Sequence, residues 1–217
     1  MTGEQLQDIP ADQYWEDFYR AKDTVWSGNA NPILVREVTG LASGTALDLG
    51  CGEGADAIWL ARRGWRVTAV DVSSTALDRA AGHAAEGGVA DRVDWQRHDL
   101  GHSFPTGAFD LVSAQFLHSP VDIPRDRILR SAAAAVAPGG TLLVAGHAGW
   151  PSWADDDRPD VHFPTTDEVL DALDLPAGQW RVDRQETLER SLTSPDGRPG
   201  TRTDNLLRVR RLTGPEA

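Results

Sequence analysis

Asp48 and the three glycines that alternate along the chain after it carry the clearest chemical signal in this 217-residue sequence. The apolar run before them predicts a buried strand, and Gly50, Gly52 and Gly54 predict a turn that residues with a Cβ atom rarely form. An apolar helical pattern follows at once, from Ala55 onward. Backbone N–H groups at a helix start, beside a strand end without bulky side chains, suit a nucleotide-like cofactor.

The position of Asp48 indicates the charge of that cofactor. Gly50, Gly52 and Ala55 also satisfy the dinucleotide pattern G-x-G-x-x-[GA], which is weak evidence when it stands alone. A carboxylate just ahead of the glycines would repel a pyrophosphate, whereas it would attract an ammonium or a sulfonium group. We therefore favour a cofactor with a cationic amino-acid portion, and an NAD(P)-dependent oxidoreductase remains the alternative.

Asp71 is a second acidic residue at a predicted strand end. It follows the alternating pattern of residues 65–70 and lies about twenty residues past the glycines. A carboxylate at this place can accept hydrogen bonds from both ribose hydroxyls of an adenosine, a feature that dehydrogenases share. The neighbouring Val72 is assigned to the same cofactor site. Asp71 therefore supports a nucleoside without deciding between cofactors.

Three motifs resemble those of one superfamily. The segment D-L-G-C-G-E-G (residues 48–54) resembles the first motif of class I S-adenosylmethionine-dependent methyltransferases, and F-D-L-V-x-x-x-x-L-H (residues 109–118) resembles a later one. An Ala-rich helical pattern at residues 125–137 ends at a P-G-G turn before a further strand pattern, which is another habit of the group. The resemblance implies S-adenosyl-L-methionine as the cofactor. It also implies a doubly wound, Rossmann-like α/β sheet of about seven strands, with the last strand antiparallel and helices on both faces.

The same resemblance assigns parts of the cofactor to individual residues. Asp48 would bind the ammonium group, and the glycines after it would allow close approach of the methionine portion. Asp99 would bond the adenine amino group, and the backbone N–H of Leu100 would bond the adenine ring. Gln115 would supply a backbone contact near the methionine portion. From the residues alone, Asp99 could instead simply begin a turn.

Aromatic side chains gather near the N-terminus. Four of them between Tyr14 and Tyr19 fall at i, i+1, i+4 and i+5, which places them on one face of a predicted helix. With Trp26, their spacing resembles the N-terminal segment of thiopurine methyltransferase and of the tellurite-resistance methyltransferases, which in the first family wraps the cofactor. The resemblance implies an aromatic lid over residues 11–32, with Trp15 and Trp26 against the cofactor. The alternative is that these aromatics cover the sheet.

The C-terminal part predicts a loop and a closing hairpin. The loop at residues 148–164 contains two tryptophans and an acidic triplet, and it is either a substrate loop or a surface insert. Strand patterns at residues 179–192 and 204–212 predict two late strands joined by a turn. The resemblance therefore covers nearly the whole chain, and we expect one methyltransferase domain over residues 1–217.

Charge and composition limit the partners. The formal net charge of -12 and the pI of about 4.8 argue against an electrostatic nucleic-acid or membrane surface and favour a small-molecule substrate. No signal peptide or membrane-spanning run is present and there is one cysteine, so we expect a cytoplasmic protein. His98 and His102 lie four apart on a glycine-containing loop without further ligands, so no metal site is expected. Oligomeric state leaves no mark in the sequence.

The methyl acceptor is the least specified part. His118 and His147 each follow a predicted strand end and are the candidate general bases, but neither has a carboxylate at a sequence spacing that would orient it. Thiols, selenols and tellurite oxyanions need little or no base near neutral pH. We therefore expect a soft nucleophile, methylated by in-line transfer through alignment alone. Two alternatives stay open: an O- or N-methyltransferase with a histidine base, and an S-adenosylmethionine-binding protein without catalysis.

Overall fold

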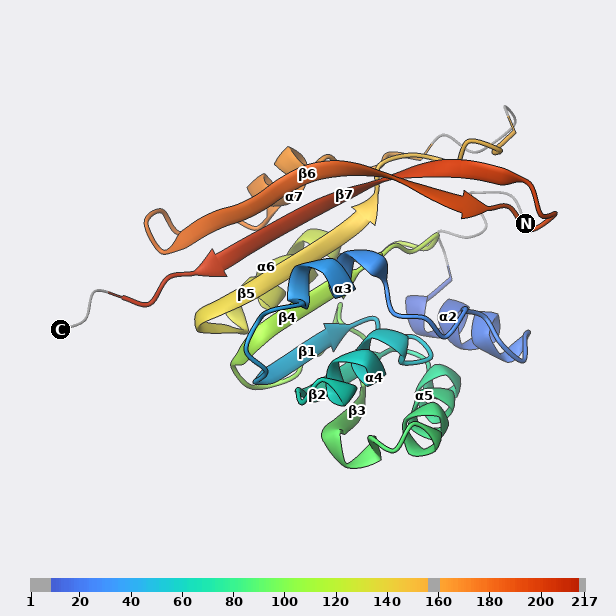
Figure 1. Ribbon diagram of the computed structural model, residues 1–217, viewed down its shortest axis with the longest axis horizontal. Helices are drawn as coiled ribbons and strands as arrows, with labels where there is room; N and C mark the ends of the chain where they lie inside the picture. The colour runs from blue at the N-terminus through green and yellow to red at the C-terminus, as the bar shows by residue number, and fades with distance from the viewer. Residues whose placement is uncertain (1–8, 156–160, 215–217) are drawn as a thin grey trace.

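The computed structural model describes residues 9–155 and 161–214 (Figure 1). Within these residues, seven strands form one sheet in the order β3-β2-β1-β4-β5-β7-β6. The strands are β1 (Thr45–Leu49), β2 (Arg66–Asp71), β3 (Val93–Arg97), β4 (Phe109–Gln115), β5 (Val136–His147), β6 (Trp180–Thr193) and β7 (Pro199–Arg211). The first five pair in parallel, and β7 runs antiparallel to both β5 and β6. The predicted doubly wound sheet with an antiparallel close is confirmed.

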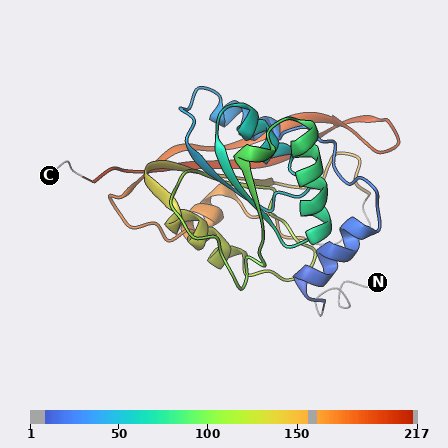
Figure 2. The ribbon, with the colours of Figure 1, turned by 90° about the horizontal axis from the view of Figure 1, so that it is seen from below.

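Helices cover both faces of this sheet (Figures 1 and 2). One face carries α3 (Pro32–Val38), α4 (Ala55–Arg62) and α5 (Ser74–Glu86), and the other carries α6 (Arg125–Ala134) and α7 (Thr166–Ala172). Helix α2 (Ala11–Arg20) lies beside α5, and the short 3-10 helix η1 (Ala90–Arg92) precedes β3. No helix in the described part of the chain has both the length and the apolar character needed to cross a membrane.

The central strand β1 shows how the sequence creates these two layers. Successive side chains of a strand point to opposite faces. Ala46 packs with Leu34 of α3 in one core cluster, whereas Leu47 packs with Leu129 of α6 in the other. By the same alternation, Asp48 shares the face of Ala46 and is the buried polar residue of the strand. This alternation therefore places the buried carboxylate of Asp48 near the C-terminal end of β1.

The boundary between α6 and β5 differs from the sequence prediction. The pattern predicts a helix over residues 125–137, but α6 ends at Ala134 and β5 begins at Val136. Val136 pairs with Phe109 at the start of β4, where the register shifts before Leu111. A β-branched side chain fits a strand ladder better than a last helical turn. The P-G-G segment therefore lies inside β5 rather than ahead of it.

Gly54, which joins the glycine turn to α4, provides a test of this local packing. Its φ is +86°, and a Cβ atom there would lie 2.7 Å from the Trp95 ring and 2.8 Å from Ala80. We expect Gly54→Ala to lower the free energy of unfolding by about 2–4 kcal/mol, because left-handed strain and overpacking act together. Gly88→Ala is the control: Gly88 has φ +68° with open space around it. The free energy of unfolding of Gly88→Ala should fall by only about 1 kcal/mol. Equal urea midpoints for the two variants would contradict this packing.

Candidate active site

The parallel strands end at one edge of the sheet, and a cavity of about 750 Å³ lies there. Its volume is in the range of small-molecule sites. Helix α2 lies at the same edge as the arrowheads of the parallel strands (Figure 1). All residues that the sequence assigns to the site line this one cavity: Trp15, Trp26, Asp48, Gly50, Gly52, Asp71, Val72, Asp99, Leu100, Gln115, His118 and His147. Their individual roles stay predictions.

The glycine turn brings backbone N–H groups to the cavity wall. Gly50 and Gly52 have φ of +69° and +53°, in the left-handed region that favours glycine. A Cβ atom at Gly52 would lie 2.9 Å from the Tyr19 hydroxyl and 3.1 Å from Trp26 Nε1. The turn therefore lets the N-terminal segment approach the backbone closely.

Asp48 is a buried carboxylate without a complete set of partners. Its Oδ2 atom, like Oε1 of the buried Gln115 on the adjacent β4, has no hydrogen-bond partner within the described ranges. Burial raises the pKa of Asp48 well above its ordinary value, and the neighbouring Asp56 and Asp71 raise it further. An ammonium group in the cavity would supply both the missing hydrogen bond and the missing positive charge.

Asp71 ends β2 and faces the same cavity. Its Oδ2 accepts the N–H of Gly52 at 2.9 Å, and its Oδ1 accepts the N–H of Ser73 at 3.0 Å. These bonds fix the carboxylate, while burial raises the pKa of Asp71 above its ordinary value. A carboxylate has about four acceptor directions. Backbone N–H groups, including that of Val72, already use most of these directions, so the contact of Asp71 with two ribose hydroxyls stays a prediction.

Asp99 and Leu100 lie in the turn after β3. Asp99 Oδ1 accepts the N–H of Gly101, and its Oδ2 bonds to His102 Nδ1, both at 2.9 Å. Asp99 therefore begins a turn, and it also lines the cavity. The two interpretations of this residue are compatible, and the adenine contact stays a prediction.

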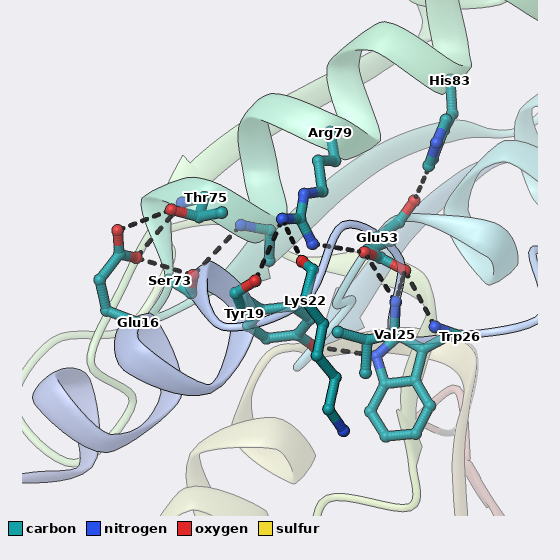
Figure 3. Close-up of polar contacts among 11 residues, drawn as sticks. Glu16, Tyr19, Lys22, Val25, Trp26, Glu53, Ser73, Thr75, Arg79 and His83 are labelled. Atoms are coloured by element: carbon teal, nitrogen blue, oxygen red, sulfur yellow. Dashed lines mark hydrogen bonds and ion pairs between the residues drawn. The ribbon is translucent and has the colours of Figure 1, made fainter.

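Glu16 connects helix α2 to the start of α5 by hydrogen bonds (Figure 3). Glu16 Oε2 accepts the Ser73 hydroxyl at 2.7 Å and the Thr75 N–H at 3.2 Å, and Oε1 accepts the Thr75 hydroxyl at 2.8 Å. The donors belong to the start of α5, where the helix dipole favours a negative charge. Although burial opposes it, the hydrogen bonds from Ser73 and Thr75 lower the pKa of Glu16 to about 2.

Arg79 and Glu53 fasten the segment after α2 to the glycine turn (Figure 3). Arg79 donates to Glu53 Oε1 at 2.9 Å and to the carbonyl oxygens of Tyr19 and Lys22 at 3.0 and 2.6 Å. The Glu53 carboxylate also accepts the backbone N–H of Trp26 at 3.0 Å. Because Glu53 belongs to the glycine turn, the position of this segment and the shape of the turn depend on each other.

The lid aromatics contact one another and the cavity. Trp15 Nε1 donates to Ser119 Oγ at 3.3 Å, and Trp26 Nε1 donates to the Tyr19 hydroxyl at 3.0 Å. In each contacting pair of aromatic rings between Tyr14 and Trp26, the two ring centroids lie 5.3 to 6.3 Å apart. Helix α2 lies at the edge of the sheet, not on a face of it (Figures 1 and 2). The aromatics therefore do not cover a face of the sheet, and their role as a lid stays a prediction.

His118 makes a structural contact through the atom that a base would need. The chain turns sharply after β4, where Phe116 has φ +53°, an uncommon value for a non-glycine residue. His118 Nε2 then accepts the backbone N–H of His147 at 2.9 Å. Burial lowers the pKa of His118 to about 4, with contributions from the charges of His147 and Arg125. Of the two candidate bases, His118 is therefore the less suitable.

His147 is oriented by a carboxylate. The register of β5 and β7 places Asp204 directly opposite His147, and Asp204 Oδ1 bonds to His147 Nδ1 at 2.8 Å. Despite burial, hydrogen bonds from His147 and Arg190 lower the pKa of Asp204, so it is an ionised acceptor. Nδ1 of His147 therefore carries the proton, and Nε2 is the ring atom left to accept one. Burial lowers the pKa of His147, although the bond to Asp204 opposes this shift.

The sequence shows no carboxylate at a local spacing that would orient either histidine, but the structure provides one for His147 from a distant strand. Asp204 lies 57 residues further along the chain and comes close only through the antiparallel pairing of β5 with β7. Both strands are visible in the sequence, but the register between them, which sets the pair, is not. Glu16, Glu53 and Arg79 are missed for the same reason, because tertiary contacts define them.

The described residues of the loop at 148–164 pair with β7. The N–H of Ala148 donates to Thr203 O at 2.9 Å, and the N–H of Ser152 donates to Thr201 O at 2.8 Å. Residues 156–160, which include part of the acidic triplet, lie outside the described residues. In the described part of the loop, no residue lines the cavity. A substrate loop here stays a prediction.

Comparison with known proteins identifies the class. A family model for a methyltransferase domain matches residues 46–140. The 2-heptyl-1-hydroxyquinolin-4(1H)-one methyltransferase of Mycobacteroides abscessus is 31% identical over 171 residues, which cover 73% of this chain and 69% of that protein. Fold and cavity together define a Rossmann-like enzyme with a small-molecule cofactor. The chain belongs to the class I S-adenosylmethionine-dependent methyltransferases, and its cofactor is S-adenosyl-L-methionine.

Other relatives match less of their own length. Ribosomal RNA small subunit methyltransferase C of Chromohalobacter salexigens is 34% identical over 116 residues, 51% of this chain and 34% of that protein. The chain therefore spans about a third of that relative. With such a relative present, the absence of nucleic-acid binding stays a prediction, as does the cytoplasmic location.

Solved structures share the fold. One was described with the conversion of a disulfide bond into a thioacetal group during echinomycin biosynthesis; its TM-score is 0.72 at 24% identity, covering 94% of both chains. TehB from Haemophilus influenzae has a TM-score of 0.68 at 15% identity, covering 91% of this chain and 67% of TehB. The N-methyltransferase NodS from Bradyrhizobium japonicum, solved with S-adenosyl-L-homocysteine, has 0.64 at 19%, covering 93% and 99%. At these identities the likeness establishes the fold alone.

Glu16→Gln tests whether fastening the lid supports cofactor binding. We expect the dissociation constant of S-adenosyl-L-homocysteine to rise roughly fivefold to thirtyfold, because hydrogen bonds to a charged carboxylate are weakened. In the folded protein the pKa of Glu16 is about 2, below its ordinary 4.5. The stabilisation that Glu16 gives is therefore fully present above pH 4.5 and is lost as the pH falls toward 2. Calorimetric titration measures the affinity.

Asp17→Asn on the same helix is the matched control, because Asp17 is exposed. Its affinity should stay within about twofold of wild type. If the two variants bind S-adenosyl-L-homocysteine equally well, the Glu16 contacts do not hold a functional lid.

Proposed function

We propose that the cavity holds S-adenosyl-L-methionine with its amino-acid end at Asp48 and its nucleoside end toward Asp71. Oδ2 of Asp48, which has no hydrogen-bond partner among the described residues, fits an ammonium group, and Gly50 and Gly52 add no side chain of their own to the cavity. The remaining assigned contacts are Gly50, Gly52, Val72, Asp99, Leu100 and Gln115, with Trp15 and Trp26 in the lid. When bound, the cofactor supplies a methyl group on a sulfonium leaving group.

We infer that the acceptor is a small molecule with an acidic hydroxyl and that His147 is its general base. The observation that carries this inference is the 2.8 Å bond between His147 Nδ1 and Asp204 Oδ1, which leaves Nε2 available at the cavity wall. A hydroxyl needs a base within hydrogen-bond reach, whereas a thiol needs little help. The Mycobacteroides abscessus relative is named for a hydroxyquinolinone, which supports a hydroxylated acceptor.

In methyl transfer, the residues of this chain accept the acceptor's hydroxyl proton and keep the reacting groups in position. With the cofactor bound, its sulfonium would supply the methyl group to the acceptor oxygen, and His147 Nε2 would take the hydroxyl proton. The ionised Asp204 stabilises the imidazolium that results, and Arg190 keeps Asp204 ionised through its own bond to Oδ2. The lid, fastened by Glu16 and Arg79, keeps water from the reacting groups.

The second candidate is the soft nucleophile expected from the sequence, a thiol or a selenium or tellurium species aligned without a base. It is supported by the resemblance of the N-terminal segment to thiopurine and tellurite-resistance methyltransferases. The likeness to TehB at 15% identity shows the fold alone and adds no acceptor chemistry. Membership of that narrower group is therefore a proposal that the acceptor will decide.

His147→Gln separates the two candidates when phenol and thiophenol acceptors of matched shape are compared. With the phenol we expect kcat to fall about a hundredfold or more, and with the thiophenol to stay within about threefold. Because the folded-state pKa of His147 is lowered below 6.5, wild-type phenol methylation should be constant near neutral pH and decline as the pH falls below 6.5. Initial rates across pH measure both effects.

Two further variants complete this test. Asp204→Asn should lower phenol turnover by a similar factor, because the imidazole loses its fixed tautomer. His118→Gln keeps an acceptor for the His147 N–H and should remain within about tenfold of wild type. Unchanged phenol turnover in His147→Gln, together with faster thiol than phenol methylation, would establish the base-free mechanism instead.

A further inference from the structure

Two arginines lie directly opposite each other in the part of the hairpin that lines the cavity. The register of β6 and β7 pairs Arg190 with Arg202, and both side chains line the cavity together with His118 and His147. We call these four residues the acceptor end of the cavity. Like charges at directly opposite positions of two strands destabilise the pair. The fold therefore maintains an unfavourable pairing at the wall of this cavity.

Of these two arginines, Arg190 is paired with a carboxylate, that of Asp204. Arg190 donates through Nε to Asp204 Oδ2, while the other oxygen of Asp204 bonds to His147. Among the described residues, the hydrogen bond that Arg202 makes is from Nε to the carbonyl oxygen of Gly149, at 3.1 Å. Its terminal guanidinium nitrogens, the half that forms a fork toward an oxyanion, are left without a protein partner in those ranges.

The acceptor end is cationic, because Arg190 and Arg202 are positively charged and the two histidines carry no negative charge. Burial lowers the pKa of Arg202, and Arg190 lowers it further while Asp204 opposes the shift. The opposite holds around Asp48, where Asp56 and Asp71 gather negative charge. The cavity is therefore polarised, with one end suited to an ammonium group and the other to an anion.

We propose that the methyl acceptor carries a carboxylate in addition to its hydroxyl and that Arg202, assisted by Arg190, binds this carboxylate. The proposal rests on the proposed function only in that the same cavity receives the acceptor. A planar guanidinium matches the two oxygens of a carboxylate, which also fixes the acceptor's orientation relative to His147. Binding the anion would relieve the repulsion between the two arginines.

The test compares 3-hydroxybenzoate with 3-hydroxybenzamide on protein loaded with S-adenosyl-L-homocysteine. Calorimetry should show the acid binding at least about tenfold more tightly than the amide. Arg202→Gln should bring the acid to the affinity of the amide and leave the dissociation constant of S-adenosyl-L-homocysteine unchanged. Arg202→Lys, which keeps the charge, should retain part of the preference for the acid.

Arg198→Gln is the matched control, because Arg198 is exposed on the same hairpin and pairs with Asp196. Equal binding of acid and amide to wild type, or no binding of either, overturns the proposal. So does a loss in Arg202→Gln no larger than in Arg198→Gln. Weaker S-adenosyl-L-homocysteine binding in Arg202→Gln would assign the arginine to the cofactor's carboxylate and also overturn it. None of these outcomes requires methyl transfer, so the proposed function fails or stands separately.

Discussion

A buried carboxylate at the end of the central strand sets the constraint that organises this site. Asp48 is buried, has an oxygen without a partner within the described residues, and lies near two further carboxylates. Removing charges from water costs several kcal/mol per ion unless opposite charges compensate. A protein selected for stability alone gains nothing from this arrangement. This arrangement supports the proposal that a cationic group of a ligand binds at Asp48.

The surrounding elements depend on that end of β1. The glycine turn follows β1 directly, Asp71 accepts a hydrogen bond from the N–H of Gly52 in that turn, and Glu53 of the same turn accepts one from the N–H of Trp26. At the other end of the cavity, the β6–β7 hairpin supplies Asp204 and two arginines. The charge therefore changes from negative near Asp48 to positive near the arginines, and His147 lies beside the arginines. This polarity supports the proposal that the cofactor and the acceptor bind at different ends of the cavity.

Local and register-dependent features differed in how well the sequence predicts them. Asp48, the glycines and Asp71 follow from strand ends and turn chemistry within a few residues, and the structure places them on one cavity wall. The sheet was predictable because each strand and helix has its own period. Asp204 was not, because its relation to His147 is a cross-strand register. The end of α6 was misjudged because pairing of Val136 with Phe109 outweighed helical propensity.

The most direct measurement compares two ligands that differ by the amino-acid portion of the cofactor. S-adenosyl-L-homocysteine and 5′-methylthioadenosine are titrated into wild type and into Asp48→Asn, whose urea midpoint should equal or exceed that of wild type. Wild type should prefer S-adenosyl-L-homocysteine by about a hundredfold, and Asp48→Asn should reduce that preference to about tenfold or less. A preference that Asp48→Asn leaves unchanged would contradict the central role of this carboxylate.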